Sequence, residues 1–364
     1  MTQPADPSFP VASLDRIWRA PSGGRRVLDP RASVRVPSVS SIDAARAKLR
    51  RIVERVPQVM VKVSGRQQGA DHVTAHFAYI GRHGDLEVET EDGERLRDPR
   101  ELADRAAEWD HEDGSARANG STSISMVLSM PAGTDAMTVL AAARAFARVE
   151  LEGRHRYMLA LHDDTDHPHV HVTVAVAPCE LGGARFNPRK ADLHRMRETF
   201  AHELRERGIE ADATPRRARG ITRRTDNVSL LKLKQRYAMT GGLIEVDEAA
   251  RRAGRNFAAS GELTPWERAA IVKQQQVKKA YGRVADQLAG LPDESDRALG
   301  RALRAYVDAM PAPFSRRLEL AAHHARDVQR YGGDTAAAGL GMFRQAPSPV
   351  KGPQSKSRGA RDRD

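Results

Sequence analysis

The sequence predicts an α+β fold with a central, mainly antiparallel sheet and flanking helices, followed by a helical C-terminal region. Two observations lead to this prediction. Short alternating or β-branched stretches occur between stretches of helical periodicity, but without the strict alternation that is typical of parallel α/β folds. The strand signals then stop near residue 225, and the following residues, with Ala, Arg and Lys, have the pattern of helices.

Each predicted element rests on a local signal. A Ser and an Asp begin the first helical stretch, and Gly208 ends the last one before the helical region. Pro131 and Gly133 stop the clearest strand before the histidine-rich region. The predicted strands are 58–65, 84–90, 121–130, 156–164 and 169–177, and the predicted helices are 41–56, 72–82, one within 93–119, 135–153 and 190–208.

The chain is expected to have four parts. Residues 1–40, rich in Pro, Ser and Arg, are predicted to be a disordered basic arm. Residues 41–225 hold all the predicted strands and form the expected main domain. Residues 226–344 are a helical region without an interpretable motif, and 345–364 are a basic, low-complexity tail.

Composition limits the class of protein. Lys and Arg total 59 against 48 Asp and Glu, which gives a net charge of +11 and favours a polyanionic partner as much as it favours an ordinary Arg-rich protein. The single cysteine, Cys179, excludes an internal disulfide and a Cys-rich zinc module. We find no apolar run of membrane-spanning length and no signal peptide, so we expect a cytoplasmic protein.

A cluster of histidines in the segment HDDTDHPHVHVTV indicates a metal site. His169 and His171 alternate along a predicted strand and therefore project to one side, while Val170 faces the core. His162 ends the preceding strand, and the tight turn between the strands brings it beside the pair. Three imidazoles suit a first-row divalent metal with open coordination positions. Asp164 could orient a ligand histidine or help to deprotonate a nucleophile.

This segment resembles the third motif of the HUH relaxases, in particular the mobilisation class that includes the T-DNA border endonucleases. That motif has a His-x-Asp start and a His-x-His end, which correspond to His162, Asp164, His169 and His171. The resemblance implies that the three histidines hold Mg²⁺ or Mn²⁺. We do not expect His167 to be a ligand, because it precedes the strand.

The resemblance also implies a tyrosine nucleophile on the N-terminal side of the histidines. Among the six tyrosines, only Tyr79 precedes the whole histidine-rich stretch, which begins at His155, in a region predicted to be structured. Its context, HFAYIGRHGDLEVE, resembles the first relaxase motif. Attack by Tyr79 on DNA would leave a 5′-phosphotyrosyl bond. Rolling-circle replication initiators of the same superfamily place the tyrosine after the His-x-His, so the order in this chain favours a relaxase.

Two further groups of residues are candidates for DNA contact. The segment STSISMVLSMPAGTD resembles the second relaxase motif, whose serine contacts DNA; Ser121 is our choice, with Ser123, Ser125 and Ser129 left open. Basic side chains after the histidines suit phosphate contacts, which add affinity but little sequence information. These basic candidates are Arg189, Lys190, Arg216, Arg217, Arg219, Arg223 and Arg224.

Together these features predict a relaxase that nicks single-stranded DNA at an origin of transfer and so initiates plasmid mobilisation. The resemblance adds accessory mobilisation and coupling proteins as partners. The alternatives are a replication initiator or transposase-type HUH nuclease, and a non-catalytic DNA-binding accessory protein. The sequence has no Walker A, HEXXH or zinc-finger motif to support a helicase, a metalloprotease or a finger protein.

Overall fold

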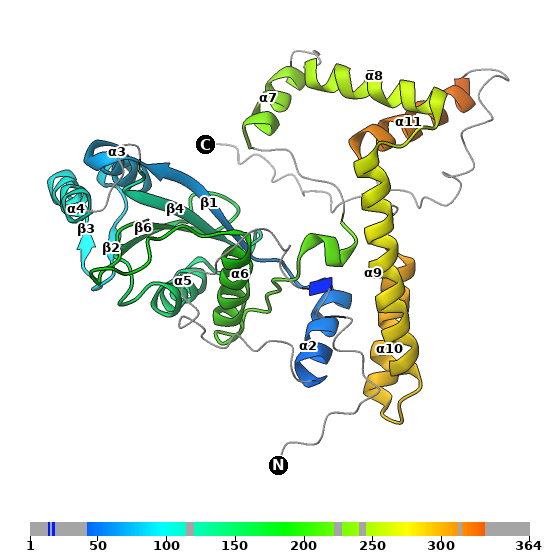
Figure 1. Cartoon of the computed structure of the whole chain (residues 1–364), viewed down its shortest axis with the longest axis horizontal. Helices are drawn as coiled ribbons and strands as arrows, with labels where there is room; N and C mark the ends of the chain where they lie inside the picture. Colours follow the sequence, from blue (N-terminus) through cyan, green and yellow to red (C-terminus); the bar gives the residue numbers. More distant parts are fainter. Residues whose placement is uncertain are drawn as a thin grey trace, which may run out of the picture. The chain divides into compact units, whose positions relative to one another are not determined.

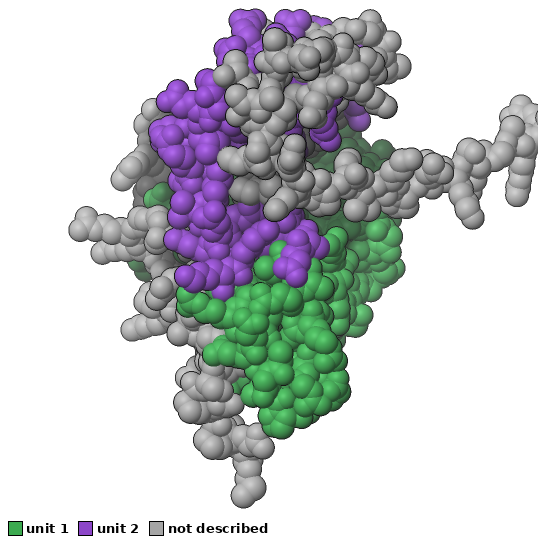
Figure 2. All heavy atoms as spheres, turned by 90° about the vertical axis from the view of Figure 1, so that its right-hand side faces the viewer, with its two compact units in different colours: residues 1–219, 280–307 green, residues 220–279, 308–364 purple. Residues whose placement is uncertain are grey.

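The computed structural model describes residues 42–113, 120–221, 228–239, 245–311 and 315–331, together with Leu14, Ile17 and Trp18. Apart from these last three residues, the predicted arm and tail lie outside the described residues. The chain divides into two compact units, the first comprising residues 1–219 with 280–307 and the second comprising residues 220–279 with 308–364 (Figure 2). The two units are described separately below.

The centre of the first unit is a six-stranded sheet with the order β1-β4-β6-β5-β2-β3 (Figure 1). Every neighbouring pair in this sheet is antiparallel. The strands are β1 (Met60–Gln67), β2 (Val88–Thr90), β3 (Arg95–Leu96), β4 (Ser123–Ser129), β5 (Tyr157–His162) and β6 (His169–Ala175). The predicted α+β class with an antiparallel sheet is therefore confirmed.

Helices cover both faces of the sheet, as Figure 1 shows. They are α3 (Gly69–Ile80) and α4 (Pro99–Glu112) on one face, and α5 (Ala136–Glu150) and α6 (Lys190–Arg205) on the other. The core under α5 and α6 includes Val170, Val172 and Val174 of β6. The core under α3 and α4 includes Phe77, Trp109 and residues of β5 such as Ala160. Alternate residues of one strand thus belong to different layers.

The remaining elements of the first unit come before, between and after the sheet strands and their covering helices in the sequence. They are α2 (Ile42–Val53), the short 3₁₀ helices η2 (Arg82–Gly84) and η3 (Arg216–Arg219), and residues of α9 (Pro265–Ala289) and α10 (Glu294–Asp308) that fall within 280–307. The Arg46 guanidinium of α2 donates two hydrogen bonds to Asp296 of α10, at 2.8 and 2.6 Å. The Trp18 indole donates to the Tyr281 hydroxyl at 3.0 Å.

The limits of these compact units differ from the boundary predicted at residue 225. Contacts such as the Arg46–Asp296 ion pair join 280–307 to the sheet-bearing unit, although 250 residues separate the two partners. The sequence pattern changes after the last strand, and that change indicated the boundary. It could not show which of the later helices packs against the sheet-bearing unit. Residue 225 therefore stays a prediction for the end of the main domain predicted at 41–225.

The second unit is helical in its described part, as the sequence predicts. It contains α7 (Val228–Met239), α8 (Glu245–Ser260), the first part of α9 and α11 (Arg316–Tyr331). A small apolar cluster of Phe257, Leu318 and Ala321 joins α8 to α11. None of the helices that the structure describes has both the length and the apolar character required to cross a membrane.

Candidate metal centre

The β5–β6 hairpin places three histidines on one face of the sheet. His162 is the Cα partner of His169 in the antiparallel register, and Ala160 is the partner of His171. Directly opposed residues project to the same side, so all three imidazoles share a face. Val170 projects to the other side and is fully buried in the core under α5 and α6. The orientation predicted for these residues is therefore confirmed.

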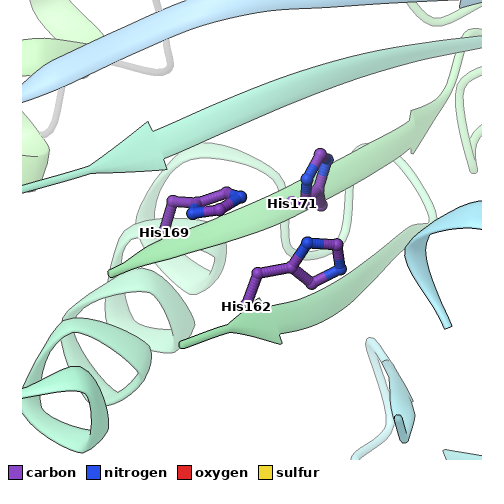
Figure 3. A group of neighbouring side chains, drawn as sticks. All are labelled: His162, His169 and His171. Atoms are coloured by element: carbon purple, nitrogen blue, oxygen red, sulfur yellow. The ribbon is translucent and has the colours of Figure 1, made fainter. Parts of the chain in front are cut away.

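The three rings converge, as Figure 3 shows. Ring centroids are 5.1 Å apart for His162 and His169 and 4.5 Å apart for His162 and His171. The third separation, between His169 and His171, is 5.3 Å. One nitrogen from each ring lies within 4.8 Å of the other two. Nitrogens bound to one ion at about 2.1 Å can be no more than about 4 Å apart, so a small inward shift would bring all three onto it.

Backbone carbonyls orient two of these rings. Nε2 of His162 lies 2.7 Å from the Ile80 carbonyl oxygen, and Nδ1 of His169 lies 3.0 Å from the His167 carbonyl oxygen. A carbonyl oxygen only accepts, so each of these nitrogens carries the proton when its ring is neutral. The lone pairs are then on Nδ1 of His162 and Nε2 of His169. This is how proteins commonly fix a metal-binding histidine.

His171 supplies the observation that tests whether a metal fits. Its Nδ1 is buried, and no atom of the described residues forms a hydrogen bond with it. A buried polar nitrogen without a partner costs free energy, and a divalent ion would remove that cost. Burial, with the neighbouring histidines adding to it, lowers the pKa of His171 to about 3. The neutral ring can donate a lone pair, so the donor set fits a divalent cation.

Helix α3 brings Tyr79 to this centre. The Tyr79 ring meets the His171 ring edge to face, with centroids 6.2 Å apart, and its side chain is 54% exposed. His76, one turn earlier in α3, stacks near Tyr79 at 6.3 Å. Nε2 of His76 lies 3.0 Å from Thr173 Oγ1 of β6, which fixes this face of the helix on the sheet. Burial lowers the pKa of His76 to about 4.

His76 was not among the sequence-based candidates. A signal was present, because His76 and Tyr79 are three residues apart and therefore share a helix face. The signal was weak, since one histidine in a helix has many structural explanations.

Asp164 contacts a different partner from the one that we expected. Its Oδ2 lies 2.6 Å from Arg82 Nη2, and no hydrogen bond joins it to His162, His169 or His171 in the described structure. The Arg82 guanidinium carbon lies 5.9 Å from the centre of the Tyr79 ring. Asp164 therefore acts on Arg82 directly, and its predicted role of orienting a ligand histidine has no hydrogen bond to support it.

The predicted DNA-contact serine lies far from the histidines. In the β4–β6 register Ser129 is opposite His169, whereas Ser123 is opposite Ala175 at the other end of the strand. Ser121 lies just before Ser123, and at the usual rise per strand residue Ser123 is itself about 20 Å from Ser129. Ser129 is thus the serine of this segment that shares the face and the end of the sheet with the histidines.

The basic candidates differ in how far they are exposed. Arg189 and Lys190, at the start of α6, are exposed, and so is Arg216. Burial lowers the pKa of Arg217, which is half-buried. Arg219 forms an ion pair with Asp212, with the two side chains 9% and 1% exposed. Arg219 is therefore held in a buried ion pair, and its contact with DNA stays a prediction; Arg223 and Arg224 lie outside the described residues.

Comparison with known proteins agrees with the resemblance in the sequence. Residues 79–209 match the model of a relaxase family, described as MobA/VirD2-like, nuclease domain. This range begins at Tyr79 and includes β4, β5 and β6 with the three histidines. The relaxase resemblance is thereby confirmed for residues 79–209, which match this nuclease-domain family.

Other comparisons add little to this family match. No curated protein matches the chain. A solved structure described as "Molecular Basis of Vancomycin Resistance Transfer in Staphylococcus aureus" is similar over 44% of this chain and 99% of its own, at 13% sequence identity and a TM-score of 0.30.

Proposed function

We propose that this protein is a relaxase that nicks one DNA strand at an origin of transfer, by metal-dependent transesterification, and so starts plasmid mobilisation. The observation that carries the proposal is the position of Tyr79. Its ring contacts His171, one of three histidines that converge on a single point, and it is exposed enough for a DNA strand to reach it.

His162, His169 and His171 would hold the divalent ion, Mg²⁺ or Mn²⁺, through one nitrogen each. When bound, the ion supplies Lewis-acid polarisation of the scissile phosphate and stabilises the charge of the transition state. The two backbone carbonyls at Ile80 and His167 keep two of the rings in the correct tautomer and orientation. Two of the three ligand histidines are thus held in a preorganised position by the backbone.

Tyr79 carries the bond exchange. Its phenolic oxygen loses a proton and forms a bond to the phosphorus of the scissile phosphodiester. The bond from that phosphorus to the 3′ oxygen breaks, and the leaving oxygen takes up a proton to become a free 3′ hydroxyl. The 5′ phosphate stays on Tyr79 as a phosphodiester, so the strand can be rejoined later without an outside energy source.

The DNA-binding part of the proposal rests on exposed basic residues. Arg189, Lys190 and Arg216 are exposed, and a chain of net charge +11 attracts a polyanion. Ser129 replaces Ser121 as the serine nearest to the cleaved strand. On the resemblance, we extend the proposal to accessory mobilisation and coupling proteins. The cytoplasm, expected from the sequence features given above, is the compartment that we propose for this action.

A covalent-adduct assay tests the function. Single-stranded oligonucleotides that tile the DNA flanking the gene, each labelled at its 3′ end, are incubated with protein and Mn²⁺ and run on denaturing gels. We expect one oligonucleotide to transfer its label to the protein, because the 3′ fragment stays bound through its 5′ phosphate. If no oligonucleotide labels the wild-type protein, the proposed function is wrong.

Matched variants test the residue roles. Tyr79→Phe removes only the nucleophilic oxygen, and we expect no adduct. Tyr237→Phe is the control, because Tyr237 is also exposed, at 44%, but lies in α7 of the other unit. An adduct that survives in Tyr79→Phe would rule out this nucleophile.

A further inference from the structure

The turn after Tyr79 has an unusual backbone. Arg82, His83 and Gly84 all have positive φ, at 51°, 56° and 100°. This conformation is costly for residues with a side chain, by roughly 1 kcal/mol or more each, and is found where the surrounding structure holds it in place. Here it ends α3 abruptly and allows the Arg82 side chain to reach the β5–β6 turn, where Asp164 lies.

The Arg82 guanidinium combines three properties. Its Nη2 is held by Asp164 at 2.6 Å, its carbon lies 5.9 Å from the Tyr79 ring centre, and its side chain is 35% exposed. Within the described part of the chain, no other acceptor binds its remaining N–H groups. A guanidinium has five donors in a planar fork, so one ion pair leaves donors for a second anion.

We propose that Arg82 binds a non-bridging oxygen of the scissile phosphate, and that Asp164 is a positioning residue that holds Arg82 in place. The inference rests on the proposed function, because it concerns the strand that Tyr79 would attack. The phosphate must contact the Tyr79 oxygen, and Arg82 is the cation that lies against the Tyr79 ring. As charge develops on the phosphoryl oxygens, a fixed guanidinium stabilises it without reorganisation.

This proposal gives Asp164 a role that differs from those predicted from the sequence. Asp164 is 52% exposed and its only described side-chain partner is Arg82. If Asp164 acts through Arg82, its removal slows adduct formation only while Arg82 is present. A base or a metal-orienting residue would slow the reaction on removal both with and without Arg82.

Labelling of arginine tests the contact without any turnover. The Tyr79→Phe protein is treated with phenylglyoxal, with and without Mn²⁺ and a single-stranded dT12 oligonucleotide, and modified arginines are mapped by mass spectrometry. We expect DNA to lower the modification of Arg82 at least fivefold. Arg95 is the control, because it is also an exposed arginine, at 60%, in an ion pair with Glu87. Equal labelling of Arg82 with and without DNA overturns the proposal.

Kinetics of adduct formation test the same contact on the oligonucleotide that the wild-type protein cleaves. We expect Arg82→Gln to slow adduct formation about 100-fold, the usual cost of one lost donor to a developing oxyanion. Arg82→Lys should retain part of the rate, and Arg95→Gln should retain all of it. A neutral methylphosphonate at the scissile position should slow adduct formation by the wild-type protein much more than it slows adduct formation by the Arg82→Gln protein. Equal slowing of both proteins contradicts a contact with that oxygen.

A double-mutant cycle separates the two residues. Asp164→Asn should slow the reaction about tenfold alone and have no further effect in Arg82→Gln, because contacting partners are not additive. Additive losses show that Asp164 acts independently. These outcomes are distinct from a failure of the proposed function, in which the wild-type protein forms no adduct while the labelling experiment still decides whether Arg82 contacts DNA.

Discussion

His162 and His169 face each other directly across the β5–β6 ladder, with their ring centroids 5.1 Å apart. The strands fix this relationship through backbone hydrogen bonds, and β6 adds His171 two residues further on. The geometry of the candidate centre therefore depends on strand register more than on loop conformation, and a one-residue slip would turn the histidines to the opposite face.

Metal binding should require the histidines as a set. We expect Mn²⁺ to raise the melting temperature of the wild-type protein, because a ligand that binds only the folded state stabilises it. His169→Ala should weaken Mn²⁺ binding at least 100-fold in calorimetric titration. His202→Ala is the control, since this partly exposed histidine lies on α6, on the other face of the sheet. Wild-type affinity in His169→Ala would show that the ion binds elsewhere.

Two adjacent residues of β6 should separate stability from metal binding. Val170→Ala removes two buried methyl groups and leaves a cavity, which should lower the free energy of unfolding by about 2 to 3 kcal/mol. His171→Ala removes a buried nitrogen that has no partner, so its effect on the stability of the metal-free protein should be much smaller. Urea unfolding without metal compares the two. A larger loss for His171→Ala would mean that the ring has a structural role.

The basic candidates should differ in what they change. Arg219→Gln leaves the buried Asp212 without its hydrogen-bonded ion-pair partner and with only Arg51, at 4.0 Å, as a cation beside it. We expect this change to cost about 3 kcal/mol of stability. Arg189→Gln, at an exposed position, should leave stability unchanged. Instead it should weaken single-stranded DNA binding and lower the slope of log affinity against log salt by about 0.7. Anisotropy titrations over a range of salt concentration and thermal melts measure both effects.

His155 should make stability depend on pH. Burial lowers its pKa from the ordinary 6.5, although its Nδ1 contacts the Ala177 carbonyl oxygen at 3.0 Å. The unfolded chain then binds more protons below pH 6.5, so stability falls as pH is lowered through that value. His155→Gln removes the titrating group, and its unfolding free energy should change less between pH 7.5 and pH 5.5, values chosen about one unit either side of the ordinary pKa. An unchanged slope would contradict this assignment.

The sequence predicted that the three histidines come together because the information needed for that prediction is local. A strand period of two decides which residues share a face, and a short hairpin decides which histidine lies opposite which. His162, His169 and His171 fall within ten residues, so no distant contact had to be known. The antiparallel class followed from the same kind of local pattern.

The parts that the sequence did not predict depend on contacts between distant segments. Ser129 could be preferred over Ser121 only once the β4–β6 register was known. Arg82 meets Asp164 across 82 positions of sequence and through a backbone turn with positive φ, which a sequence with arginine and histidine there does not suggest. Arg219 belongs to a basic run that resembles a solvated surface, yet its ion pair with Asp212 is buried.

The short hairpin that carries the histidines has a consequence for the order in which the candidate centre is assembled. Its ligands are close in sequence and need only one small loop to close, whereas Tyr79 joins them from 83 positions before His162. Local structure forms early in folding and long-range contacts form late, because loop closure must be achieved first. The hairpin should therefore form before α3 docks on it. A partly folded chain would bring the three histidines together while Tyr79, the proposed nucleophile, is still far from them.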